Sequence, residues 1–163
     1  MDAFSSDNGG MDFFNPDLFS SNIETEEGNF QYGDVKINLE FVHGSNQFIE
    51  KFVSRVVWPS AEAMCEYFVQ HPELVKDKTV LELGSGTGLC GLVVSKLGAS
   101  KVVMTDYNDE AISIIDINID RNSQRSSCSA FKLSWGDEAQ ADYVRQQSLD
   151  GGLFDLVIGT DVV

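Results

Sequence analysis

The fold of this chain is decided by the stretch Val80-Leu81-Glu82-Leu83-Gly84-Ser85-Gly86-Thr87-Gly88. It has the pattern of a strand that runs into a glycine-rich turn, and a helix-forming segment follows it. Glycines let the backbone bend sharply and allow a ligand to approach main-chain atoms closely. The first amide groups of the helix beyond have no intrahelical partner. The stretch therefore predicts a strand–loop–helix unit that presents its backbone to a ligand.

Strand-like and helix-like segments alternate around and beyond this stretch. A helix is expected over Leu89–Leu97, and Asn108 is expected to cap another helix. Strands are expected over 79–83, 101–106, 129–133 and 154–158. The last of them is apolar almost throughout, as a strand covered on both faces should be. Alternation of this kind predicts an α/β fold with a parallel sheet and helices on its faces.

The residues upstream predict a β-hairpin followed by a helix. Val35–Phe41 alternates apolar and polar residues with the period of two that is typical of a half-buried strand. A turn cluster follows at 43–46, and residues 48–57 are expected to return as the second strand of a hairpin over about 30–57. Trp58-Pro59 opens a helix expected over 58–71, and His71-Pro72 ends it.

Residues 1–28 predict a disordered acidic tail, because they are polar, lack a helical or strand period and contain no Lys or Arg. The whole chain has a formal net charge of −15. Such a charge repels phosphate backbones, which disfavours a nucleic-acid substrate. A basic protein partner fits this charge better, and solubility is the alternative explanation for it.

Membrane and metal functions find no support in the composition. No stretch approaches the roughly 20 apolar residues that span a bilayer, and the N-terminus has no basic residue or apolar run of a secretory signal. We therefore expect a cytoplasmic protein, with the nucleus as a further location. Cys65, Cys90 and Cys128 are odd in number and form no CxxC pair, and the two histidines lack a metal-binding spacing. No metal site is expected.

Two acidic residues stand out near strand ends. Glu82 lies on an otherwise apolar strand, and a carboxylate is costly to bury without a partner. A cationic or hydrogen-bonding ligand at the carboxyl end of the strand would supply that partner. Asp106 ends the next strand, 18 residues beyond Gly88, near the spacing at which an acidic residue reaches a ribose diol. A helix-capping or turn role is the structural alternative for Asp106. Tyr107 follows and could lie against a purine.

A competing interpretation comes from Gly86-Thr87-Gly88-Leu89-Cys90-Gly91, which matches the GxGxxG fingerprint of nicotinamide and flavin enzymes. Dehydrogenase loops bind a pyrophosphate anion, and Glu82 is poorly placed for that. S-adenosylmethionine has no phosphate and carries a sulfonium and an amino group, which nearby carboxylates favour. The expected cofactor is therefore S-adenosylmethionine, and a dehydrogenase is the more distant alternative.

The segment Glu82–Gly88 resembles the nucleotide-loop motif of class I methyltransferases. More narrowly, the chain resembles the seven-β-strand protein-lysine methyltransferases related to the methyltransferase-like 21 group and calmodulin-lysine methyltransferase. The resemblance covers roughly residues 30–163. Four further segments carry it: Val57-Trp58-Pro59-Ser60, Met104-Thr105-Asp106, Leu133-Ser134-Trp135-Gly136-Asp137, and residues 154–163.

The resemblance implies a Rossmann-like sheet over 78–163, within a methyltransferase domain whose front part is residues 29–163. It implies that Trp58 contacts the cofactor, Asp106 holds the ribose hydroxyls, and Trp135 flanks the adenine. Core packing is the alternative role of both tryptophans. The cofactor-binding residues expected from the motifs and the resemblance together are Trp58, Glu82, Gly84, Ser85, Gly86, Gly88, Asp106, Tyr107, Trp135 and Thr160.

Asp161 matches the first position of the family's DxxY motif and is the expected catalytic residue, which orients the reacting amine. The tyrosine of that motif would follow Val163, so we expect a sheet truncated after its fourth strand and a chain unstable or inactive by itself. The expected function is a protein-lysine N-methyltransferase with a protein substrate. The alternatives are a methyltransferase of the same fold acting on a small molecule or another residue type, and an inactive or partner-binding fragment.

Overall fold

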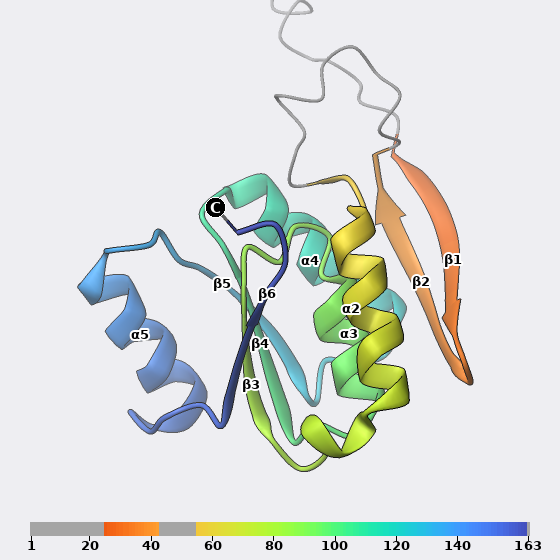
Figure 1. Cartoon of the computed structure of the whole chain (residues 1–163). Coiled ribbons are helices and arrows are strands. Elements are labelled where there is room, and N and C mark those ends of the chain that lie inside the picture. Colours follow the sequence, from red (N-terminus) through yellow and green to blue (C-terminus); the bar gives the residue numbers. More distant parts are fainter. Residues whose placement is uncertain (1–24, 43–54, 163) are drawn as a thin grey trace, which may run out of the picture.

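A computed structural model describes residues 25–42 and 55–162, and these form a central sheet covered by helices (Figure 1). The sheet is parallel, with the strand order β5-β4-β3-β6. β3 (Thr79–Leu83) pairs with β4 (Lys101–Asp106) on one side and with β6 (Leu156–Gly159) on the other. β5 (Cys128–Lys132) lies beyond β4. The parallel α/β sheet expected from the sequence is confirmed, and each strand begins and ends within two residues of its expected position.

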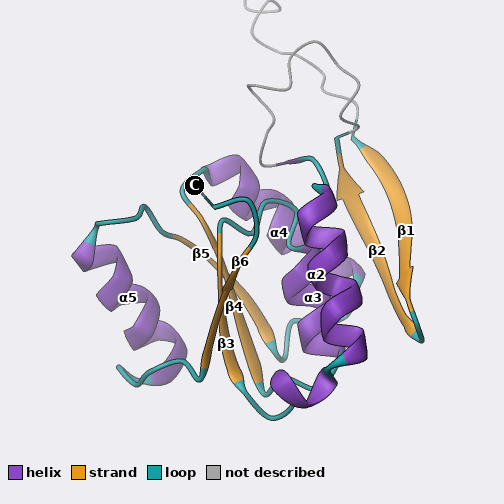
Figure 2. Cartoon of the chain, in the orientation of Figure 1, coloured by secondary structure: helices purple, strands orange, loops and turns teal. Residues whose placement is uncertain are grey.

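Helices cover both faces of this sheet (Figure 2). α2 (Pro59–Gln70), α3 (Leu89–Lys96) and α4 (Asp109–Arg121) lie on one face, and α5 (Glu138–Leu149) lies on the other. Crossovers between parallel strands are right-handed, so the chain changes face when the strand order reverses. It moves outward from β3 to β4 and β5, and then returns past β3 to β6.

The hydrophobic core lies between the sheet and α2–α4. Alternation ceases in β4, where every residue after the first is buried, because this strand is covered on both faces. α3 is also buried along almost its whole length, since it lies between the sheet and the outer elements. The largest fully buried side chains are Ile37, Leu39, Leu92, Met104, Ile115 and Ile119.

The helix starts follow the expected signals. Asn108 caps α4, and its side chain accepts a hydrogen bond of 2.9 Å from the Glu110 amide. Pro59 is the first residue of α2, where its missing amide hydrogen costs nothing. The helix ends at Gln70, and a short 3-10 turn, η3 (Pro72–Leu74), follows.

The hairpin before α2 is present, but its strands are not the expected pair. β2 (Val35–Phe41) pairs antiparallel with β1 (Glu26–Tyr32), which precedes it. Of the expected return strand over 48–57, residues 48–54 lie outside the described residues, and 55–57 are not in a strand. The sequence pattern did not predict β1, because one of the inward positions of this strand is Gly28. A Cβ there would lie 2.6 Å from the Phe41 ring, so the apolar alternation is broken.

The expected disordered tail over 1–28 is wrong for its last three residues, because β1 begins at Glu26. Residues 1–24 lie outside the described part of the chain. Within the described ranges, no helix is long and apolar enough to cross a membrane. The same ranges contain no cluster of three or more His, Cys, Asp or Glu side chains arranged to hold a metal ion.

Gly91 lies in the first turn of α3, where the helix touches the sheet most closely. A Cβ at this position would lie 2.6 Å from Glu82 Oε2 and 2.6 Å from the Met104 sulfur. Both neighbours are buried, so neither can move aside freely.

We expect Gly91→Ala to lower the free energy of unfolding by about 1–3 kcal/mol, the range for overpacking a core. In an exposed helix the same change would stabilise by roughly 0.5–1 kcal/mol, because glycine is a poor helix former. Urea unfolding followed by circular dichroism measures the difference. Ala63→Gly at an exposed position of α2 calibrates the helix propensity. A Gly91→Ala variant as stable as the wild type would contradict the close contact.

Candidate functional site

A cavity of about 770 Å³ opens at the carboxyl ends of β3, β4 and β6, beside the amino-terminal end of α2. This is the place where the strand order reverses, and open parallel sheets bind ligands in the crevice formed there. The cavity is lined by Val56, Trp58, Ala61, Glu82, Gly84, Ser85, Gly86, Thr87, Leu89, Cys90, Asp106, Tyr107, Ser134, Trp135, Thr160, Asp161 and Val162.

The glycine loop between β3 and α3 forms the floor of the cavity. Gly84, Gly86 and Gly88 all have positive φ angles, of 61°, 54° and 78°, a backbone region that other residues rarely adopt. The loop is tied to the neighbouring strand, because the Ser85 amide donates to the Thr105 carbonyl at 2.9 Å. The three glycines are therefore required by the path of the chain, as the sequence indicated.

Glu82 is buried at the inner end of the cavity, with 3% of its surface exposed. Its Oε2 accepts a hydrogen bond of 3.0 Å from the Gly91 amide, in the first turn of α3. Burial raises the pKa of Glu82 to about 8, although the hydrogen bonds from Ser85 and Gly91 oppose this shift and nearby Asp106 adds to it. Glu82 thus has a protein partner, which the sequence did not reveal, and a cation in the cavity would favour its ionised form.

Asp106 is buried at the end of β4, and each carboxylate oxygen accepts one backbone hydrogen bond. Oδ2 accepts from the Gly86 amide at 3.1 Å, and Oδ1 accepts from the Asn108 amide at 3.1 Å. Asp106 therefore stabilises the turn that follows β4, which is the structural role considered for it. Each oxygen keeps a free lone pair, and the side chain still lines the cavity, so a ligand role is compatible with it.

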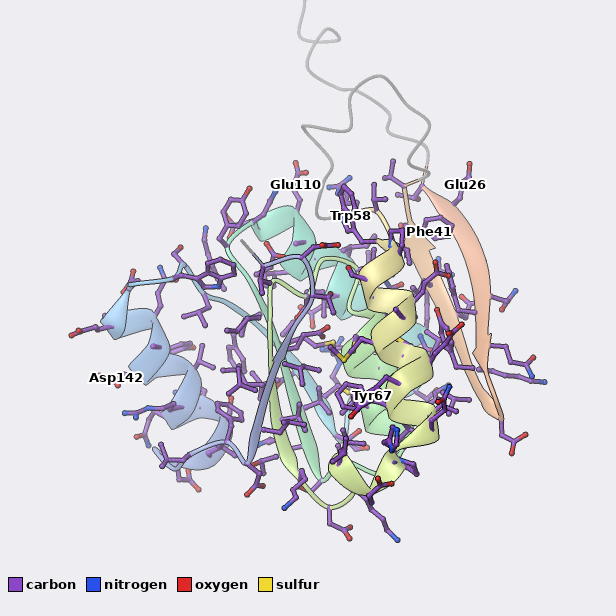
Figure 3. The ribbon with its side chains drawn as sticks, viewed as in Figure 1. Glu26, Phe41, Trp58, Tyr67, Glu110 and Asp142 are labelled. Atoms are coloured by element: carbon purple, nitrogen blue, oxygen red, sulfur yellow. The ribbon has the colours of Figure 1, made fainter. Side chains whose placement is uncertain are left out.

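Large aromatic side chains surround the cavity and remain accessible to solvent. Trp58, Trp135 and Tyr107 are 37%, 58% and 70% exposed. Figure 3 shows Trp58 at the amino-terminal end of α2. Core packing, the alternative considered for both tryptophans, is wrong at these exposures. Flat apolar rings at the edge of a cavity suit a ligand with a planar aromatic group.

Asp161 lies in the turn after β6 and has a φ of 53°, in the left-handed region. A residue with a side chain pays for this conformation, and such strain is common at functional sites. The carboxylate accepts a hydrogen bond from the Ser60 hydroxyl of α2, a residue 101 positions away. Val162 follows, and it packs so closely on the loop that a Cβ at Gly84 would lie 2.9 Å from its Cγ1. The turn is therefore held over the cavity from two sides.

The structure brings nine of the ten expected cofactor-binding residues, and Asp161, to this one cavity. Gly88 is the exception, because it does not line the cavity but sets the start of α3, where a Cβ would lie 3.0 Å from the Met104 sulfur. Three further residues at the site were not expected from the sequence: Cys90 and Ser134, which line the cavity, and Ser60, which holds Asp161. Ser60 and Ser134 lay within motifs already noted. Cys90 gave only a buried-helix signal, and its pKa is raised by its contact with Cys65 and by burial.

The loop geometry disfavours the dehydrogenase interpretation. A pyrophosphate would need free loop amides, but the Gly86 and Gly91 amides already donate to carboxylates. Glu82 and Asp106 would also repel a phosphate anion. The GxGxxG spacing is instead explained by the positive φ angles of Gly86 and Gly88 and by the close approach of α3 to the sheet at Gly91.

Comparison with known proteins agrees with this geometry. The sequence matches the lysine methyltransferase family over residues 44–163. It is 35% identical over 123 residues to protein N-terminal and lysine N-methyltransferase efm7 from Neurospora crassa, covering 68% of this chain and 43% of that protein. It is 33% identical over 108 residues to calmodulin-lysine N-methyltransferase from Arabidopsis thaliana, covering 64% and 33%.

Among solved structures, a 16S rRNA methyltransferase (RsmC) from T. thermophilus superimposes with a TM-score of 0.58 at 18% identity, covering 83% of this chain and 32% of that chain. This likeness shows the shared fold. The chain spans less than half the length of the two curated relatives described above. The family match covers most of the residues that form the sheet and the cavity, and the resemblance inferred from the motifs is confirmed. The chain belongs to the lysine methyltransferase family.

Proposed function

We propose that the cavity binds S-adenosylmethionine and that the protein transfers its methyl group to a lysine side chain of a protein substrate. The observation that carries this proposal is the gathering of Glu82, Asp106 and Asp161 with exposed aromatic rings around one cavity in a chain of the lysine methyltransferase family. The related T. thermophilus methyltransferase was solved with S-adenosylmethionine and guanosine.

The donor set of the cavity suits this cofactor. The acidic side chains of Glu82 and Asp106 favour a ligand that carries a sulfonium and an ammonium, because opposite charges attract strongly away from water. The tryptophans and Tyr107 supply flat surfaces for an adenine ring. Asp106 keeps lone pairs with which to accept hydrogen bonds from a ribose diol. The cationic groups, the adenine ring and the ribose diol of the cofactor thus each have a partner of matching chemistry.

When bound, S-adenosylmethionine supplies an activated methyl group. The residues of the chain provide alignment, which is worth roughly 7–11 kcal/mol in well-oriented reactions. A lysine amine reacts only when neutral, and the apolar rings around the cavity lower its pKa by removing water. Asp161, held by Ser60, orients the amine at the mouth of the cavity. A protein substrate with basic character agrees with the acidic surface of the chain.

We expect S-adenosylhomocysteine, the product form of the cofactor, to change the intrinsic tryptophan fluorescence of the chain. The sequence contains two tryptophans, Trp58 and Trp135, and both line the cavity. A saturable change should appear in a titration, and Trp58→Phe and Trp135→Phe should each remove part of it. Calorimetry gives the affinity independently. Adenosine triphosphate and a nicotinamide dinucleotide are the controls, and binding of either in preference to S-adenosylhomocysteine would refute the proposed cofactor.

We expect this binding to tighten as the pH rises toward 8. The pKa of Glu82 is raised to about 8 in the free chain, so the carboxyl is protonated below that value. A bound cation favours the ionised form, which means that binding releases a proton at lower pH. Affinity should rise by up to about tenfold per pH unit between roughly pH 6 and 8, and then level off. Calorimetry across this range should show a flat profile for Glu82→Gln, and an unchanged slope in that variant would exclude Glu82 as the linked group.

We expect Asp161→Asn to slow methyl transfer while leaving the cofactor affinity within about threefold. A misplaced amine costs on the order of a hundredfold in rate, whereas the cofactor has other partners in the cavity. Transfer of a labelled methyl group to protein lysines, measured at saturating cofactor, tests the rate. Asp142→Asn on the exposed surface of α5 is the matched control. Label that appears on a nucleic acid or a small molecule but on no protein would contradict the lysine assignment.

A further inference from the structure

Two buried asparagines belong to the interface of α4: Asn118 lies within the helix, and Asn122 is its C-cap residue. Asn118 is completely buried and Asn122 is 8% exposed. Asparagine is a poor residue for a helix interior such as position 118, and a buried side-chain amide is costly when it makes no hydrogen bonds. Both side chains therefore need hydrogen-bond partners.

The partners are the backbone groups on the free edge of β2. Asn118 accepts from the Glu40 amide at 2.7 Å and donates to the Glu40 carbonyl at 3.0 Å. Asn122 does the same with Asn38, at 3.0 Å and 2.7 Å. Four residues of a helix rise about 6 Å, which is close to the roughly 6.8 Å between alternate residues of a strand. The two amides thus act like a neighbouring strand and dock the hairpin on α4.

Asn118 makes one further contact that Asn122 does not. Its Nδ2 also donates to the Thr87 carbonyl at 2.9 Å, whereas the second hydrogen of Asn122 goes to the Asn118 carbonyl within the helix. Thr87 is buried in the glycine loop and lines the cavity. The side chain of Asn118 therefore connects the hairpin and the glycine loop to α4.

We propose that Asn118 is a positioning residue for the cofactor loop, and that it couples the docking of the β1–β2 hairpin to the order of residues 84–88. The loop needs such support because three of its five residues have positive φ angles, and flexible glycines gain much freedom when released. The Thr87 carbonyl lies on the side of the loop toward α4, where Asn118 meets it. The ligand-binding part of this inference rests on the proposed function.

The pair Asn118→Asp and Asn122→Asp separates positioning from docking. Each substitution keeps the side-chain oxygen that accepts from a β2 amide. It replaces the NH₂ group, which donates two hydrogen bonds, with an anionic oxygen that faces two carbonyl oxygens. Both should therefore weaken the hairpin contact, N122D less so because Lys96 Nζ lies 3.5 Å from Asn122 Oδ1 and favours an anion there. Only N118D disturbs the Thr87 carbonyl. We expect N118D to weaken S-adenosylhomocysteine binding by about tenfold or more, the value of one or more hydrogen bonds, and N122D to change it by less than about threefold.

Hydrogen exchange of the ligand-free chain supplies a second measurement that needs no ligand. The Ser85 and Gly88 amides report on the loop, since they donate to the Thr105 and Ser85 carbonyls at 2.9 Å and 2.8 Å. We expect both amides to exchange faster in N118D than in N122D when the two variants are compared under conditions that give them the same free energy of unfolding. Equal effects of the two variants on loop exchange and on affinity would overturn the proposal and leave Asn118 as a docking residue only.

Two further outcomes have defined meanings. If the wild-type chain does not bind S-adenosylhomocysteine, the proposed function fails, and loop exchange decides the role of Asn118 by itself. If N118D does not fold, exchange of the wild-type chain in low denaturant decides it. The Glu40 amide, which donates to Asn118, and the Gly88 amide should then open with the same free energy. If the Gly88 amide opens with a lower free energy than the Glu40 amide, the proposal is overturned.

Discussion

The parallel pairing of β3 with β4 on one side and β6 on the other is the constraint on which the other features depend. Because the chain leaves β3 in one direction and returns to it from the other, the loops at the carboxyl ends diverge and open a cavity. The same reversal places α5 on the opposite face from α3 and α4. It also brings the turn at Asp161 beside a glycine loop about 75 residues earlier in the chain, a separation that only tertiary structure can close.

Several polar side chains around this cavity join one element to another. Glu82 joins β3 to α3, Asp106 joins β4 to the glycine loop, and Ser60 joins α2 to the turn after β6. In each case a side chain satisfies a group of another element, so no charged group is buried without a partner among them. Such contacts fix the shape of the cavity more strictly than apolar packing would, because hydrogen bonds depend on direction as well as distance.

Sequence patterns located the parallel strands, the helix capped by Asn108 and most residues of the cavity, because these depend on local periodicity and on glycine, acidic and aromatic residues at strand ends. They failed where the signal was not local. β1 was missed since the inward Gly28 makes room for the Phe41 ring. Asn118 and Asn122 were missed because their partners are backbone atoms of another element, which any sequence can supply. Ser60 was within a noted motif, but its contact with Asp161 spans most of the chain.

The docking of the hairpin on α4 has a consequence for how this protein tolerates change. The two asparagines bind main-chain groups of β2, so these four hydrogen bonds do not depend on which side chains occupy positions 38 and 40. Arg121 adds a surface ion pair with Glu40, but such pairs contribute little. Positions 38 and 40 can therefore accept substitutions, whereas Ile37 and Leu39 of the same strand belong to the core. Sequence divergence between relatives should be higher at these two strand positions than at the two amide positions, even though all four belong to a single interface.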